Sequence, residues 1–121
     1  MKTKFFLSVI LALSSTLDAL SQIPQGFNYQ AIARDASGNP ITNTAIPVRI
    51  TIQSSQTGGT IFWQELHSSV TTNDFGMLTL VVGQGTRQGG TAATFADIDW
   101  GVAPKYIKTE IDYGGWKDMG V

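Results

Sequence analysis

The stretch that decides the fold is IPVRITI, residues 46–52, in which apolar and polar side chains alternate. Successive side chains of a β-strand point to opposite faces, so the alternation predicts a strand with one buried face. Pro47 lacks an amide donor, which predicts that the strand begins at a sheet edge. The residues expected inward are Ile46, Val48, Ile50 and Ile52, and those expected outward are Pro47, Arg49, Thr51 and Gln53.

The segment before this strand predicts another strand and a turn. Residues 27–35 form the expected strand, with Phe27, Tyr29 and Ala31 on one face, and its imperfect alternation indicates contacts on both faces. The sequence DASGNP at 35–40 combines residues that bond to nearby backbone with a glycine that tolerates positive φ. We therefore expect a hairpin or a turn that switches the chain between sheets.

Two further strands are expected after residue 52. SSQTGGT at 54–60 has the composition of a flexible loop, and a strand follows at 61–71. The turn at 73–76 leads to a strand at 77–82, and we expect these two strands to pair as a hairpin. The expected buried row of the second is Leu78, Leu80 and Val82. In the first, Phe62, Leu66 and Val70 are expected on one face and Trp63, Glu65 and His67 on the less buried one.

The last third of the chain predicts a loop, an apolar clamp and a strand. Residues 83–94 form a long Gly/Thr/Gln loop with the single charge Arg87. At 95–100 the apolar residues Phe95, Ile98 and Trp100 are expected to plug the end of a sandwich. The strand at 105–113 is expected to have Ile107, Thr109 and Ile111 inward, with a hydroxyl-to-backbone contact from Tyr106, and another strand begins at 116.

Together these patterns predict an all-β fold, a two-layer antiparallel β-sandwich with immunoglobulin-like or transthyretin-like topology. No helical period is visible after the N-terminal segment. Because the strand starting at 116 stops almost at once, we expect the domain to be truncated at its C-terminus, without a complete last strand.

The N-terminus has the plan of a secretory signal peptide. Lys2 and Lys4 precede an apolar run at 5–13, and the small residues Ala19 and Ser21 fit a cleavage site. The run is shorter than the ~20 residues of a membrane span. We expect residues 1–21 to be removed, which leaves 22–121 as a single domain of 100 residues that is secreted or bound to the cell surface.

Composition and charge indicate how the chain is stabilised and which partners are not expected. The chain has a formal net charge of −1 and no cysteine, so its stability must come from packing and hydrogen bonds rather than disulfides. Without residues 1–21 it retains six basic and eight acidic side chains and no basic cluster. Nucleic acid and anionic membranes are therefore not expected as partners, and no membrane span is expected in the mature chain.

No motif indicates catalysis, a metal or another cofactor. His67 is the only histidine, and no phosphate-loop or EF-hand sequence is present. Calcium could use oxygen ligands, but turn formation explains most of the candidates. Those candidates are Asp35, Asn39, Asn73, Asp74, Asp97 and Asp99.

Aromatic residues offer one alternative, a surface for stacking sugars. Its rings would be Trp63, Trp100, Tyr106, Tyr113 and Trp116. Core packing is the commoner use of such residues. The residues expected on any ligand surface are Trp63, His67 and Trp116.

A series of motifs spans the mature chain: PQGFNYQA at 24–31, RDASGNP at 34–40, TNDFG at 72–76, GQGT at 83–86 and IDWG at 98–101. The series resembles the N-terminal β domain of large exported proteins of Bacteroidota-type bacteria. The resemblance implies no catalytic residues. It implies a non-catalytic structural or interaction module of a secreted or cell-surface protein, whose partners are other domains of a larger protein or another chain. The alternative is a carbohydrate-binding module that binds glycan through exposed aromatics.

Overall fold

The computed structural model describes residues 25–120, which form seven strands and one 3-10 turn. The expected signal peptide lies outside the described residues. Between residues 25 and 120, no helix is long and apolar enough to cross a membrane. The elements are β1 (Phe27–Ile32), β2 (Ala45–Ser55), β3 (Gly58–Thr71), β4 (Met77–Val82), β5 (Thr86–Gly89), η2 (Phe95–Asp97), β6 (Tyr106–Asp112) and β7 (Trp116–Asp118).

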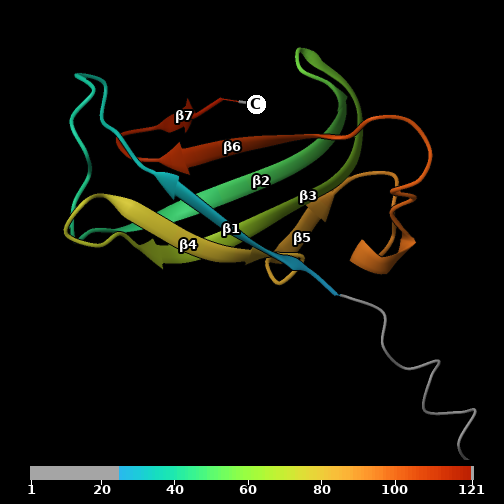
Figure 1. Cartoon of the computed structure of the whole chain (residues 1–121), viewed down its shortest axis with the longest axis horizontal. Coiled ribbons are helices and arrows are strands. Elements are labelled where there is room, and N and C mark those ends of the chain that lie inside the picture. Colours follow the sequence, from blue (N-terminus) through green and yellow to red (C-terminus); the bar gives the residue numbers. More distant parts are fainter. Residues whose placement is uncertain (1–24, 121) are drawn as a thin grey trace, which may run out of the picture.

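Two antiparallel sheets pack face to face, which confirms the predicted β-sandwich. The small sheet pairs β1 with β4, and the large sheet has the order β5-β3-β2-β6-β7 (Figure 1). This two-plus-five division differs from a constant-type immunoglobulin domain, in which the first and fourth strands share a four-stranded sheet with the second and fifth. The small sheet has only two strands, so both its outer edges are left without a neighbouring strand among residues 25–120.

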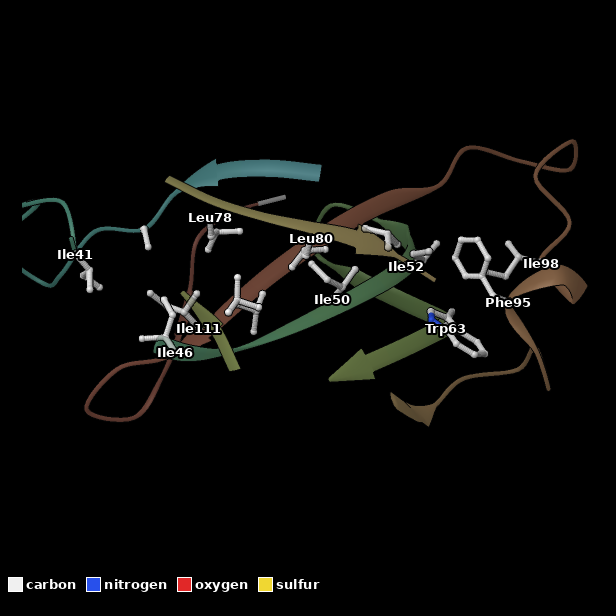
Figure 2. Close-up of a cluster of buried hydrophobic side chains, with 14 of the residues drawn as sticks. Ile41, Ile46, Ile50, Ile52, Trp63, Leu78, Leu80, Phe95, Ile98 and Ile111 are labelled. Carbon is white, nitrogen blue, oxygen red and sulfur yellow. The ribbon is translucent and has the colours of Figure 1, made fainter. Parts of the chain in front are cut away.

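The core lies between the two sheets, where β2 faces β4. The four residues of β2 predicted inward are 0–2% exposed, and Leu78, Leu80 and Val82 of β4 are buried against them (Figure 2). Both predicted rows are confirmed. On the outer face of β2, Thr51 is also buried, and its Oγ1 accepts a 3.0 Å hydrogen bond from Gln64 Nε2.

The predicted pairing of β3 with β4 is wrong, although the turn between them is correctly placed. Asn73 Oδ1 accepts hydrogen bonds of 2.9 Å from the amides of Phe75 and Met77, and Gly76 has a φ of +81°. The turn carries the chain into the other sheet, where β4 pairs with β1 in register from Met77 to Val82. The turn depends on residues that are close in sequence. The choice of the strand that pairs with β4 depends on packing between residues that are far apart in sequence.

The predicted faces of β3 are also wrong for its first half. Trp63 and Glu65 are buried toward the core rather than on the less buried face. The cause is an irregularity in the register with β2, where His67 pairs with Val48 and Val70 pairs with Ile46. Three residue steps on β3 therefore match two on β2, as in a β-bulge, and the inward row changes phase. Trp63 and Glu65 face inward before the bulge, and Val70 faces inward after it.

Two segments predicted as loops are partly strand. The flexible loop expected at 54–60 is a tight hairpin, because β2 runs to Ser55 and β3 starts at Gly58. The loop expected at 83–94 contains β5, which pairs with β3. The predicted Tyr106 contact is not among the hydrogen bonds of the described residues. Instead, Tyr29 of the small sheet accepts a 2.9 Å bond from Thr109 of β6, which joins the two sheets.

The apolar clamp closes one end of the sandwich, as predicted for two of its three residues. Phe95 and Ile98 are buried, while Trp100 is 46% exposed. Phe95 packs its ring edge-on against Trp63 and lies 5.7 Å, centroid to centroid, from Trp100. Figure 2 shows Phe95 and Ile98 beyond the ends of β2 and β4. At the C-terminal end, the strand expected from 116 forms β7 and pairs with β6.

Candidate functional site

The most unusual group in the described chain is the carboxylate of Glu65. It projects from β3 into the interior, and the residue has no exposed surface. Transfer of an ionised carboxylate from water into a protein interior costs several kcal/mol. Such a group persists only where hydrogen bonds replace its hydration shell.

Four nitrogen atoms surround this carboxylate. Oε1 accepts hydrogen bonds from Trp63 Nε1 at 2.7 Å and from the Gly83 amide at 2.8 Å. Oε2 accepts one from the Gly85 amide at 3.0 Å and lies against His67 Nε2. The indole and the two backbone amides can only donate, which matches the acceptor-only character of an ionised carboxylate. We call these five residues the Glu65 latch.

The Glu65 latch fastens the connection between the two sheets. Gly83 and Gly85 follow β4 of the small sheet and precede β5 of the large one. Glycine is needed at both positions, because Gly83 has a φ of +104° and a Cβ on Gly85 would lie 2.7 Å from Glu65 Oε2. The latch therefore requires backbone to approach the carboxylate more closely than a side chain would allow.

A groove opens beside the latch, between β3 and β4. It has a volume of about 510 Å³, and residues 66–71, 79–81 and 84–86 line it. His67 and Gly85 lie at the boundary between this groove and the buried carboxylate. Its other polar residues are Ser68, Ser69, Thr71, Thr79, Gln84 and Thr86, so the lining contains no Asp, Glu, Lys or Arg. We call it the β3–β4 groove.

The three residues predicted for a ligand surface do not come together. Trp63 is 4% exposed and His67 is half-buried, and both belong to the latch on the inner side of the large sheet. Trp116 lies at the other end of the strand order and is 41% exposed. The alternation of residues in the sequence predicted that Trp63 points outward, because that alternation does not reveal the bulge in β3.

Trp116 instead belongs to an ion-pair cluster on the outer face. Arg49 donates to both oxygens of Glu110, from Nε at 3.0 Å and from a terminal guanidinium nitrogen at 2.9 Å. The guanidinium carbon lies 4.2 Å from the centroid of the Trp116 ring. The hydrogen bonds that Arg49 donates to Glu110 raise the pKa of Arg49 above its ordinary value, against a smaller opposing effect of desolvation. This arrangement stabilises the pairing of neighbouring strands.

The acidic and amide residues considered for calcium act in turns. Asp35 Oδ1 accepts from the amides of Ser37 and Asn39, and Asp99 Oδ1 accepts from the amide of Gly101. Asp97 Oδ2 accepts from the backbone and hydroxyl of Thr94 at the start of η2. In the part of the chain that the structure describes, no three His, Cys, Asp or Glu residues cluster as metal ligands would.

Sequence reasoning missed Glu65 as the central residue of this region. The available signal was an acid between two aromatic rings in a strand, WQELH at 63–67, together with the glycine pair of GQG at 83–85. A carboxylate inside an apolar strand needs donors, and close-packed glycines supply backbone amides. Periodicity alone treats such an acid as a solvent-facing residue.

Comparison with protein families assigns this architecture to a family. Residues 28–119 match the model of a domain of unknown function (DUF8740), and the chain belongs to that family. The match runs from β1 to the residue after β7, so it contains both sheets, the Glu65 latch and the β3–β4 groove. Searches of curated proteins and of solved structures returned no match.

The latch predicts a large effect from replacing Glu65→Gln. The amide keeps the shape but offers one acceptor atom to three obligatory donors, and its NH₂ group would face backbone N–H groups. We expect a loss of about 3 kcal/mol in the free energy of unfolding, measured by urea denaturation. The matched variant Glu110→Gln, at a partly exposed ion pair, should lose about 1 kcal/mol or less. Equal losses for the two variants would contradict the latch.

The close approach of Gly85 to the Glu65 carboxylate leads to a separate prediction. In Gly85→Ala the new methyl would meet Glu65 Oε2 at 2.7 Å and His67 Nε2 at 2.8 Å. We expect a loss of about 1–3 kcal/mol in thermal or urea unfolding, the range for overpacking. Gly89→Ala is the control, because nothing lies within 4 Å of its added Cβ. A Gly85 variant as stable as the Gly89 variant would show that the loop does not depend on this approach.

Proposed function

We propose that this chain is a non-catalytic structural or interaction module of a secreted or cell-surface bacterial protein. The observation that carries the proposal is the state of the Glu65–His67 pair, the arrangement most similar to a catalytic acid–base pair. Both carboxylate oxygens already accept hydrogen bonds from protein nitrogens, and Glu65 has no exposed surface. The hydrogen-bonding capacity of the pair is therefore already used to hold the loop at 83–85.

Export is the second part of the proposal. It rests on the leader pattern at residues 1–21 and on the resemblance of the motifs between residues 24 and 101 to exported proteins of Bacteroidota-type bacteria. The cysteine-free composition is compatible with a chain that folds after export without disulfides. Partners of such a module are other domains of a larger exported protein, or a separate chain.

The carbohydrate alternative gains no support from the positions of the aromatic rings. Trp63 packs against Phe95 and donates its indole N–H to Glu65, and Trp116 already has a guanidinium over its ring. A sugar platform needs open ring faces on one surface. We therefore do not propose glycan binding as a second function.

The non-catalytic role predicts that the purified mature chain turns over no ester, glycoside or peptide substrate. The comparison variant is His67→Gln, whose amide can still donate to Glu65 Oε2 while the imidazole base is removed. Wild type and variant should give the same rate as buffer alone in chromogenic assays. A rate above the blank in the wild type that is lost in His67→Gln would overturn the proposal.

Export predicts a defined product when the full chain is expressed in a secreting bacterium. The protein recovered outside the cytoplasm should have the intact mass of residues 22–121, with Gln22 free or cyclised. A variant with Lys2 and Lys4 replaced by Glu should lower the yield of this product, because the leader needs a positive start. Recovery of only the uncleaved chain from the cytoplasm would contradict export.

A further inference from the structure

We infer that the β3–β4 groove is a docking site for an extended strand of another polypeptide chain. The inference rests on the proposed interaction role and names the kind of partner. Its first support is that two strand edges border the groove. β5 pairs with β3 only from Gln64 to Leu66, so Ser68–Thr71 lacks a strand neighbour on that side among residues 25–120. β4 pairs with β1 alone, which leaves its second edge open along the same groove.

The general spacing of packed sheets suits one inserted strand. Hydrogen-bonded strands lie about 4.8 Å apart, and face-packed sheets lie about 10 Å apart. At these general spacings, one strand between the edges of two packed sheets is within pairing distance of both. It would close this side of the sandwich, in the manner of β-strand addition.

The β4 edge of the groove lacks the usual protection of a sheet edge. Exposed edges are commonly blocked by Lys, Pro, bulges or very short strands. β5 carries Arg87, and β7 has three residues that include Lys117 and Asp118. By contrast, β4 has six residues, MLTLVV, with no charge, Pro or Gly, and its pairing with β1 has no register shift.

The lining specifies the chemistry of the occupant. Hydroxyl groups of Ser68, Ser69 and Thr79 line the groove together with the apolar Leu80 and Val81, and the lining has no acidic residue, lysine or arginine. A charged segment would lose hydration without gaining an opposite charge there. The structure thus points to an uncharged, β-prone segment of another protein, whose backbone pairs with both edges and whose side chains are small or apolar.

The test uses the mature chain, residues 22–121, against a displayed library of random ten-residue peptides. Enriched peptides should be uncharged and rich in β-branched residues. On binding, amide hydrogen exchange should slow in Ser68–Thr71 and in Thr79–Val81, and the same peptide N-methylated at alternate residues should bind at least about tenfold more weakly, since it lacks backbone donors. Protection at only one of the two edges, or elsewhere, would overturn the inference.

Paired substitutions separate docking from folding. Thr79→Lys puts a charge on the exposed face of β4 in the groove, and Thr60→Lys puts the same charge on an exposed position of β3 outside it. Both should fold with unchanged circular dichroism, and only Thr79→Lys should weaken the enriched peptides, by about tenfold or more. Equal weakening by both, or failure to enrich any peptide, would also overturn docking. Those results would leave the non-catalytic role intact, because it fails only if turnover is found.

Discussion

The structure depends on the need to solvate one buried charge. Glu65 sits where an apolar residue would be expected, and its carboxylate receives donors from a ring in its own strand and from the backbone of the loop at 83–85. These donors are fixed in direction, so the loop has little freedom to move without leaving them unpaired. A single ionised group thereby holds together two segments that are 18–20 residues apart.

The latch also compensates for the weakness of a two-stranded sheet. Two strands alone are marginally stable in water, and here β1 and β4 gain stability by covering the core of β2. Fixing the loop after β4 limits how far this small sheet can slide. The hydroxyl of Tyr29, which accepts from Thr109, does the same on the β1 side. Polar contacts at both flanks thus set the position of a sheet that apolar packing alone would hold less specifically.

The sequence predicted those parts of the fold that depend on local chemistry. The inward row of β2, the turns at Asp35 and Asn73, and the buried row of β4 follow from period-two alternation and from side chains that bond to nearby backbone. The pairing of β4 with β1 did not follow, because the alternating apolar and polar residues of β4 fit a strand in either sheet. Of the candidate site, Trp63 and His67 were identified as residues of interest. Their joint role with Glu65 was not, since it depends on two glycines brought close by the fold.

The bulge in β3 links the latch to the β3–β4 groove. Before it, Glu65 faces inward, and the pairing with β5 ends at Leu66. After it, Val70 returns to the core opposite Ile46, and no strand of the described chain replaces β5. A regular β3 could not bury both Glu65 and Val70, because five steps along a strand reverse the face. The irregularity at Ser68 and Ser69 therefore lets one strand hold the internal carboxylate in its first half and present an unpaired edge in its second.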